Sequence, residues 1–324
     1  MVEVKGLTKI YRTYQREEGL SSAFKSLFFR KYEKKLAVDR INFSIKPGEV
    51  IGFIGPNGAG KSTVIKMMTG ILRQTAGKLT VMGFDPFEDR QEYVQNIGVV
   101  FGQKSQLWWD IPPADTFQLL KRIYKIPEAE FKERLEYMIE MLDIERIAKT
   151  PVRNLSLGER MRCEILVSLL HNPKVVFLDE PTIGLDVVAK DKIREFIKLV
   201  NKRYGTTFII TTHDMDDIEE LCKRVVIIDK GVIMYDGLLS RIKEKYVDSK
   251  QIEVVFETKT SKKPKRKGVE IVSWTPYRTT IKVPSTKGSV SKTVFYLMRN
   301  FPVEDLTIKE PKIESIIKKM YEGG

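Results

Sequence analysis

Residues 55–63, with the sequence GPNGAGKST, constrain the fold of this 324-residue chain more than any other segment. They match the pattern GxxxxGK[ST] and lie between the β-branched run VIGFI and the helix-like run VIKMMTG. Glycines in such a loop let backbone N–H groups turn towards phosphates at the N-terminus of the following helix. The pattern therefore predicts a strand, a phosphate-binding loop and a helix. A chance glycine turn is the alternative, and the flanking strand and helix argue against it.

The lysine and the hydroxyls of this loop have the chemistry that a bound nucleotide requires. Lys61 is expected to reach the β- and γ-phosphates, and the Ser62 hydroxyl is expected to ligate Mg²⁺. The expected nucleotide-binding residues of the loop are Gly55, Asn57, Gly58, Ala59, Gly60, Lys61, Ser62 and Thr63.

From residue 49 onward, short β-branched runs alternate with longer stretches of helical periodicity. This alternation is typical of βαβ units around a parallel sheet, and runs such as VVFLDE lack the polar alternation of a half-exposed strand. The predicted fold class is α/β, with a parallel sheet covered by helices on both faces. The strand-like runs lie at 50–54, 97–101, 175–178, 207–211 and 225–228.

Two other parts of the chain have a different pattern. Between residues 112 and 149, apolar residues recur at spacings of three and four, which predicts a helical subdomain of about 104–160 inserted in the sheet. After residue 237, strand-like and helical stretches are mixed. We therefore expect a nucleotide-binding domain over 1–236 and a small α+β accessory domain over 237–324. The first hairpin of the accessory domain is expected to carry KTSKKPKRKG in solvent.

Charge and composition limit the classes of function. The net charge of +13 is concentrated near the C-terminus, where residues 237–324 contain 19 Lys and Arg against 10 Asp and Glu. Such a surface suits nucleic acid, anionic lipid or an acidic partner, and charge alone does not choose among them. No apolar run approaches the roughly 20 residues needed to cross a bilayer, so a cytosolic protein is expected. The two cysteines, Cys163 and Cys222, are expected to be reduced and structural.

The segment 14–35 combines basic residues with apolar residues on one face of an expected helix. Two interpretations stay open, namely a helix that docks on a membrane or permease and a helix that lies on its own domain. The apolar positions are Leu20, Phe24, Leu27, Phe28 and Tyr32.

Asp179 and Glu180 follow the run VVFL, so both carboxylates are expected at the C-terminal edge of a buried strand, where open α/β sheets bind ligands. Asp179 is predicted to hold Mg²⁺. Glu180 is placed to accept a proton from, or to orient, the water that attacks the γ-phosphate. A solvated strand end is the alternative, and the phosphate-binding loop makes it the weaker one.

The segment LSLGE, residues 155–159, precedes the helix-like run MRCEILVSLL. Its backbone N–H groups and the Ser156 hydroxyl would form a second anion site at a helix N-terminus. The alternative is a capping box, in which Ser156 and Glu159 satisfy the free amides without any ligand. These five residues alone favour the cap.

Six motifs follow one another in the order found in ABC-transporter ATPase subunits, and the chain resembles that family over about residues 1–236. The resemblance implies a P-loop NTPase core that binds ATP with Mg²⁺. The motifs are GPNGAGKST, Gln103, LSLGE, VVFLDEP, Gly184-Leu185-Asp186 and His213.

Several residue roles follow from this resemblance. Tyr11 would stack on adenine, Gln103 would sense Mg²⁺ and the γ-phosphate as a metal ligand, and His213 would contact the γ-phosphate. Glu180 would be the catalytic carboxylate. His171, the other histidine, is expected to be structural.

The resemblance also implies that two subunits enclose ATP between them. In this family the signature motif of one subunit, here LSLGE, completes the ATP site of the other. Ser156 and Gly158 are therefore expected to act in trans, and Asp186 is expected to line the dimer seam. The family pattern is LSGGQ, from which Leu157 and Glu159 depart. Because a carboxylate near phosphate is unfavourable, Glu159 is expected to make the capping interaction instead.

In this family a groove beside Gln103 and the helical subdomain grips a helix of the permease. The expected partners are an integral membrane permease and a second copy or homologous ATPase subunit, at the cytoplasmic face of the membrane. Residues 101–126 and the C-terminal domain resemble ATPase subunits of ABC-2-type exporters. The alternative to a permease contact is that Trp108, Trp109 or both pack inside the helical subdomain. The expected groove residues are Leu107, Trp108, Trp109 and Phe117.

The competing interpretation is a soluble ABC-type ATPase that acts on nucleic acid or ribosomes. The chain has one phosphate-binding loop, no long coiled coil between Gln103 and Ser156, and no aromatic residues interleaved with its basic cluster. No nucleic-acid partner is therefore expected. A small-molecule kinase, a third interpretation, leaves LSLGE, Gln103 and His213 unexplained.

Overall fold

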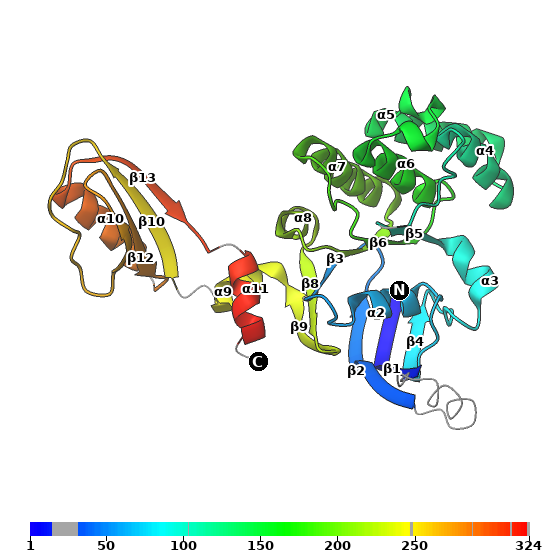
Figure 1. Ribbon diagram of the computed structural model, residues 1–324, viewed down its shortest axis with the longest axis horizontal. Coiled ribbons are helices and arrows are strands. Elements are labelled where there is room, and N and C mark those ends of the chain that lie inside the picture. Colours follow the sequence, from blue (N-terminus) through cyan, green and yellow to red (C-terminus); the bar gives the residue numbers. More distant parts are fainter. Residues whose placement is uncertain (15–31, 103, 247–248, 287, 312, 323–324) are drawn as a thin grey trace, which may run out of the picture. The chain divides into compact units, whose positions relative to one another are not determined.

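The computed structural model describes residues 1–14, 32–102, 104–246, 249–286, 288–311 and 313–322. The chain divides into two compact units, Met1–Gly237 and Leu238–Gly324. Figure 1 shows the elements of both. Among the described residues, no helix is both long enough and apolar enough to span a membrane.

A six-stranded sheet in the order β5-β6-β7-β3-β8-β9 forms the centre of the first unit. β3 pairs in parallel with β7 and β8, and β6 pairs in parallel with β5 and β7. The strands are β3 Val50–Ile54, β5 Ile97–Phe101, β6 Val175–Asp179, β7 Thr207–Thr211, β8 Arg224–Asp229 and β9 Val232–Leu238. This sheet confirms the predicted α/β fold.

Helices α4 to α7 lie on one side of this sheet, and α2 lies on the other (Figure 1). The stretch that follows β5 is helical in α4 and α5. The helices of the first unit are α2 Lys61–Met68, α3 Arg90–Tyr93, α4 Pro113–Ile123, α5 Glu128–Leu142, α6 Leu157–Leu169, α7 Val187–Tyr204 and α8 Met215–Leu221, with 3-10 turns at Val94–Asn96, Ile147–Lys149 and Val152–Asn154.

A second sheet of three antiparallel strands, in the order β2-β1-β4, lies outside the sequence prediction. Its strands are β1 Val2–Tyr14, β2 Tyr32–Ile45 and β4 Ala76–Val81. The helix expected over 14–35 lies mostly outside the described residues. At its two ends it is wrong, because Tyr14 and Tyr32 pair with each other as strand residues.

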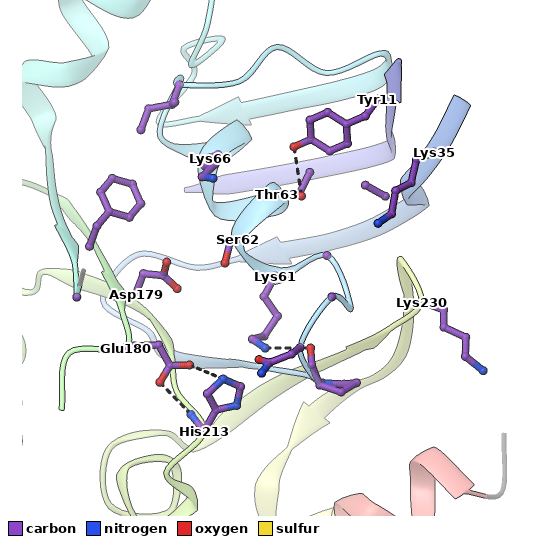
Figure 2. Close-up of a pocket in the computed structure, with 18 of the residues that line it drawn as sticks. Tyr11, Lys35, Lys61, Ser62, Thr63, Lys66, Asp179, Glu180, His213 and Lys230 are labelled. Carbon is purple, nitrogen blue, oxygen red and sulfur yellow. Dashed lines mark hydrogen bonds and ion pairs between the residues drawn. The ribbon is translucent and has the colours of Figure 1, made fainter. Parts of the chain in front are cut away.

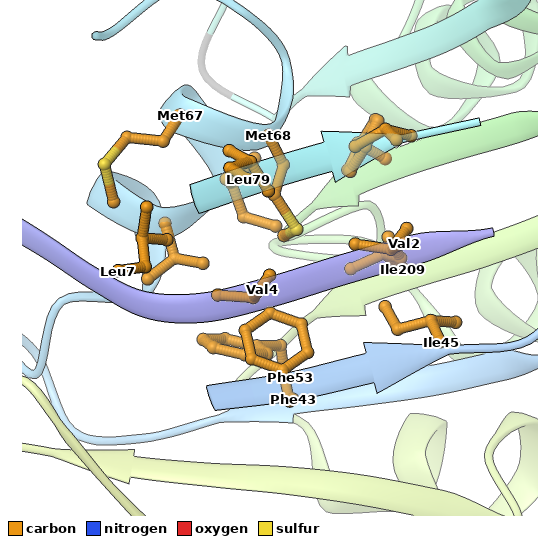
Figure 3. Close-up of a cluster of buried hydrophobic side chains, with 14 of the residues drawn as sticks. Val2, Val4, Leu7, Phe43, Ile45, Phe53, Met67, Met68, Leu79 and Ile209 are labelled. Carbon is orange, nitrogen blue, oxygen red and sulfur yellow. The ribbon is translucent and has the colours of Figure 1, made fainter. Parts of the chain in front are cut away.

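Buried apolar side chains join the two sheets (Figure 3). Val4 of β1 and Phe43 of β2 pack towards Phe53 of β3, and the rings of Phe43 and Phe53 lie 5.8 Å apart between centroids. Met67 and Met68 of α2 belong to the same cluster. Each large apolar side chain removed from water contributes roughly 2 kcal/mol. The cluster therefore fixes α2, and the loop in front of it, between the sheets.

The second unit is a four-stranded antiparallel sheet in the order β11-β12-β10-β13, with α10 packed on it. The predicted first hairpin is wrong, because β10 pairs with β12 and β13 and not with β11. The apolar β10, with Ile252, Val254 and Phe256 buried, takes a central position where both of its edges are covered. The elements are α9 Leu239–Tyr246, β10 Ser249–Phe256, β11 Glu270–Trp274, β12 Arg278–Pro284, α10 Ser289–Asn300, β13 Val303–Lys309 and α11 Ile313–Glu322.

His171, just after α6, links the helical subdomain to the parallel sheet. Its ring stacks on Tyr124 with 4.0 Å between ring centroids. Its Nε2 lies 2.9 Å from the carbonyl oxygen of Ile97 and donates to it, while Nδ1 is buried without a hydrogen-bond partner in the described part of the chain. Burial lowers the pKa of His171 to about 4, because an added proton would be buried without a carboxylate to neutralise it. The structural role expected for His171 fits this position.

We predict that His171 makes the fold sensitive to acid. Its pKa is about 4 in the folded protein and 6.5 ordinarily, so its stabilisation is present above pH 6.5 and is lost as the pH falls towards 4, roughly 3 kcal/mol in all. His171→Phe keeps an aromatic ring against Tyr124 but cannot take up a proton. Its free energy of unfolding in urea should depend less on pH over this range than that of the wild type. Parallel curves for the two proteins would contradict the prediction.

Candidate functional site

A cavity of about 1140 Å³ opens beside the C-terminal ends of the parallel strands (Figure 2). Segments that follow β3, β5, β6, β7 and β8 all reach it, because parallel strands end at the same edge of a sheet. Ten predicted site residues line it, namely Tyr11, Asn57, Gly58, Gly60, Lys61, Ser62, Thr63, Asp179, Glu180 and His213.

The phosphate-binding loop runs from the end of β3 to the start of α2. Gly60 is the N-cap of α2 and has a φ of 111°, a left-handed value that favours glycine. A Cβ at this position would lie 2.7 Å from the carbonyl oxygen of Ala37. The amides in the first turn of α2 have no partner inside the helix, so they are available to an anion in the cavity. Gly55 and Ala59 belong to the same loop but are not among the described residues of the cavity wall.

Lys61 is 7% exposed, and within the described residues the hydrogen-bond partners of its ammonium group are neutral carbonyl oxygens. Its Nζ donates to the carbonyl oxygens of Gly55 at 2.5 Å and Pro56 at 3.2 Å. Burial lowers the pKa of Lys61, and the nearby carboxylates of Glu180 and Asp179 oppose that shift. A nearly buried cation that faces a cavity is stabilised by an incoming anion such as phosphate.

Two segments place the acidic side chains of the cavity. Asp179 ends β6 and accepts a hydrogen bond from the Thr211 hydroxyl of β7. Glu180 follows with a φ of 56°, and its Oε1 lies 3.1 Å from Nε2 of His213. The backbone N–H of His213 also donates to Glu180 Oε2 at 3.2 Å. Burial raises the pKa of Glu180, while His213 and Lys61 pull it down, so the group is suited to exchange a proton.

A buried carboxylate, Asp217 of α8, holds both of these segments. It accepts hydrogen bonds from the hydroxyls of Thr182 and Thr212, and it pairs with Arg194 at 2.6 Å. Thr182 lies just after Glu180 in the chain, and Thr212 immediately precedes His213. Sequence reasoning missed Asp217, because nothing in the acidic run DMDDIEE marks which carboxylate is buried.

Ser62 and Asp179 supply the oxygen donors expected for Mg²⁺. Figure 2 shows the Asp179 carboxylate pointing towards the Ser62 hydroxyl across the cavity. Hard oxygen ligands suit Mg²⁺, which usually keeps several waters and binds phosphate oxygens beside one or two protein groups. The described residues contain no group of three His, Cys, Asp or Glu that could hold a metal on its own. These donors therefore fit a metal that arrives with a nucleotide. Gln103 lies outside the described residues.

The segment LSLGE does not reach the cavity of its own chain within the described residues. Ser156 is the N-cap of α6, and the predicted capping box is confirmed. Glu159 N–H donates to Ser156 Oγ at 3.3 Å, and Ser156 N–H donates to the Glu159 carboxylate at 2.8 Å. The hydrogen bonds from Ser156 lower the pKa of Glu159. Gly158 and Asp186, the N-cap of α7, are likewise absent from the described cavity wall.

Sequence reasoning missed much of the basic wall of the cavity. The charged side chains come from β1, β2, α2, the segment after β5 and the turn after β8, and no local motif marks them. Tyr11, which was predicted, lies on β1 with its Oη 3.4 Å from Thr63 Oγ1. The additional basic lining residues are Arg12, Lys35, Lys66, Lys104 and Lys230.

The predicted permease groove separates into exposed and buried residues. Trp108 and Trp109 are 59% and 54% exposed, so they are available to a partner. Leu107 and Phe117 are buried, so the expectation that they contact a partner is wrong for the described structure. Both side chains are apolar, and burying them within the chain removes their surface from water.

Glu164 of α6 fixes the segment that carries the two tryptophans. Its carboxylate is buried, accepts a hydrogen bond from the Ser105 hydroxyl, and accepts one from the N–H of Gln106 at 3.0 Å. Burial raises the pKa of Glu164, and these hydrogen bonds oppose the shift. The helix that begins with LSLGE is thus bonded to the segment after Gln103.

Comparison with known proteins agrees with this geometry. The ABC transporter family model matches residues 38–183. The ABC transporter ATP-binding protein NatA of Bacillus subtilis is 33% identical over 69% of this chain and 90% of that protein. The chain belongs to the ABC transporter ATP-binding family. As a member of it, the chain is an ATPase that binds ATP.

Other members of the family match over smaller shares of their length. The linearmycin resistance ATP-binding protein LnrL of Bacillus subtilis is 35% identical over 64% of this chain and 66% of that protein. The probable multidrug ABC transporter ATP-binding protein YbhF of Escherichia coli is 33% identical over 70% of this chain, which spans 39% of that protein.

Solved structures of ABC ATPases share the fold. CbiO1 of Clostridium perfringens, part of the ABC transporter complex cbiONQ, has a TM-score of 0.62 at 27% identity, over 75% of this chain and 90% of that one. The dimeric structure of an ATP-binding cassette in a post-hydrolysis state, bound to ADP and Pi, has a TM-score of 0.60 at 24% identity, over 74% and 99%.

We predict that Glu180→Gln separates ATP binding from hydrolysis. The amide keeps the shape of the side chain but cannot accept a proton, so phosphate release should fall about 100-fold or more while ATP affinity stays within a few-fold. Burial raises the pKa of Glu180, so this base becomes protonated sooner as the pH is lowered. On acidification, wild-type hydrolysis should therefore begin to decline at a higher pH than it would with an ordinary glutamate.

Phosphate release and nucleotide titration measure the two effects. Glu92→Gln is a matched control, since it makes the same chemical change at an exposed glutamate. Lys61→Ala should instead weaken ATP binding itself. Normal phosphate release by the Glu180→Gln protein would exclude Glu180 as the proton acceptor.

Proposed function

We propose that this ATPase dimerises around ATP to power export through a separate integral membrane permease, as a subunit of an ABC-2-type exporter. The observation that carries the proposal is the exposed pair Trp108 and Trp109, which follow Ser105 and Gln106, the two residues that donate hydrogen bonds to the buried Glu164. The names of two relatives, one for linearmycin resistance and one for multidrug transport, support export as the direction of transport.

The cavity supports a specific set of contacts with ATP. The amides of the loop and the Lys61 ammonium would hold the β- and γ-phosphates, and Tyr11 would stack on adenine. The basic side chains of the wall would offset the charge of the triphosphate. Ser62 and Asp179, with Gln103, would hold Mg²⁺, which when bound neutralises phosphate charge.

Hydrolysis in this proposal depends on the Glu180 and His213 pair. Glu180 accepts a proton from the attacking water, and the contacts with the ring and the backbone N–H of His213 keep its carboxylate oriented. Lys61 and the helix N-terminus stabilise the charge that develops on the γ-phosphate. Opening of the dimer after hydrolysis is the mechanical output.

Exposed apolar side chains support the dimer. Ile183, Val187 and Val188 are all exposed near the N-cap of α7, and Leu157 is exposed beside Ser156. Such a group on one surface favours contact with a second chain. In the dimer, Ser156 and Gly158 would complete the ATP site of the other subunit, and Asp186 would lie at the seam.

We predict that Val188→Glu disrupts the ATP-dependent dimer without harming the single chain. A carboxylate in the first turn of α7 is favourable for the isolated helix, whereas an unpaired charge at the seam opposes association. In the Glu180→Gln background, the concentration needed for dimers in light scattering should rise about tenfold or more. Val272→Glu, at an exposed valine of the second unit, is the control. Equal dimerisation of both variants would place the seam elsewhere.

The proposed division of labour assigns nucleotide binding to residues 1–236 and an accessory role to 237–324. All predicted nucleotide contacts precede residue 237. The protein would be held at the cytoplasmic face of the membrane by its permease. Trp108 and Trp109 would insert between helices of that partner, because exposed tryptophan is a strong anchor at protein interfaces.

We predict that a multi-span membrane protein copurifies with the ATP-bound Glu180→Gln protein from detergent-solubilised native membranes. Trp108→Ala with Trp109→Ala should reduce its recovery about tenfold or more, because two interface anchors are lost. Hydrolysis by the isolated protein should be unchanged.

Mass spectrometry of the purified complex measures recovery. Tyr277→Ala is the matched control, because it removes an exposed aromatic side chain of the second unit. Ribosomes or nucleic acid in place of a membrane protein would refute the export proposal and leave the ATPase activity established.

A further inference from the structure

The second unit has a basic and apolar surface that the ATPase chemistry does not use. We propose that this surface, formed by the loop 258–268 and the outward face of α10, binds an anionic phospholipid bilayer. We call it the α10 surface. The inference goes beyond the proposed transport function and rests on it in one respect, namely that the protein works beside a membrane.

Charge is separated within the second unit. The loop 258–268 contains six basic residues and no acidic residue, and α10 contains Lys292 and Arg299 and no acidic residue. In the described part of the chain, none of these basic side chains has a carboxylate within ion-pair distance. A surface of one sign without internal partners attracts polyanions.

The basic residues of the sheet behave differently. Lys250 pairs with Glu310 at 2.6 Å, and Lys309 pairs with Glu253 at 2.8 Å. The carboxylates of the unit therefore neutralise the sheet and leave the positive charge on the loop and α10. The net charge of the C-terminal residues is thus a property of the α10 surface.

Hydrogen bonds hold the loop against the helix. Tyr296 of α10 donates from its Oη to the carbonyl oxygen of Lys265 at 3.1 Å, and the N–H of Lys265 lies 3.4 Å from the same Oη. The neighbouring Pro264 is buried, and the guanidinium of Arg266 lies 6.0 Å from the centroid of the Tyr296 ring. Loop and helix therefore form one continuous surface in the second unit.

The outward face of α10 exposes large apolar side chains. Thr293 and Leu297 point into the core, while Phe295 and Met298 are 67% and 65% exposed. Lys292 and Arg299 lie on the same face, because positions three and four apart share one side of a helix. Figure 1 shows α10 as a single helix packed on the sheet of its unit.

A bilayer surface satisfies both halves of this arrangement. Lys and Arg side chains bind headgroup phosphates, and Phe and Met gain by entering the boundary between headgroups and acyl chains. Nucleic acid would satisfy the charges and could stack a base on Phe295, but it would leave Met298 in water, since a thioether offers a base neither a hydrogen bond nor a flat ring. Lipid is therefore the better match to the four side chains that α10 presents.

Vesicle flotation of the full chain, without permease or nucleotide, tests the inference. The protein should float with vesicles of phosphatidylcholine mixed with phosphatidylglycerol, and not with phosphatidylcholine alone. Lys262→Ala with Lys265→Ala and Lys267→Ala should weaken binding about 100-fold, from about fivefold for each lost charge. Phe295→Asn with Met298→Asn should also weaken it, and that loss should persist at high salt.

A control with the same change in charge separates local from overall attraction. Lys78→Ala with Lys202→Ala and Lys223→Ala removes three exposed lysines from the first unit and should leave flotation nearly unchanged. Circular dichroism checks that every variant is folded. Because the assay contains no permease, its failure is distinct from failure of the export proposal.

Four outcomes would overturn the inference. They are equal binding to phosphatidylcholine alone, an equal loss in the first-unit control, tighter binding to an oligonucleotide than to anionic vesicles, and a change of oligomeric state without lipid in the Phe295→Asn and Met298→Asn protein. The last outcome would identify the face as a contact between two copies of the chain.

Discussion

The parallel pairing of β5, β6, β7, β3 and β8 is the constraint on which the rest of the first unit depends. Because these strands run in one direction, the loop before α2, the Asp179 and Glu180 pair, His213 and Lys230 all come to one edge of the sheet. Short segments after β3 and β6 are therefore enough to place the nearly buried Lys61 near the carboxylates of Asp179 and Glu180. The basic side chains of the wall outnumber these two carboxylates, so the edge carries the excess positive charge that a nucleotide triphosphate would offset.

The fold of the first unit could be predicted where burial is continuous. Runs such as VVFL and TFII have one stable arrangement, a strand covered on both faces, and their positions agree with β6 and β7. The antiparallel sheet was missed, although Val2 and Val4 alternate with charged residues, because β1 pairs with strands at residues 32–45 and 76–81 that lie far from it in sequence. The strands β10 and β13 pair although they lie far apart in sequence, and no local pattern reveals this pairing.

The candidate site divides in the same way. Lys61, Ser62 and Glu180 stand in local motifs, so their convergence could be predicted, while their roles stay predictions. Asp217 could not be predicted, since its burial depends on how α8 packs. The exposure of Trp108 likewise depends on which side of a turn faces the subdomain. A tryptophan in this segment is equally compatible with a buried position.

Glu164 has a mechanical consequence. Its buried carboxylate accepts hydrogen bonds from Ser105 and Gln106. Turning α6 away from that segment would leave the carboxylate oxygens buried without donors, which costs free energy, so the two segments resist rotation against each other. Through these hydrogen bonds, α6, which begins at the N-cap Ser156, is joined to the segment that carries Trp108. A displacement imposed on either segment should therefore move the other as well.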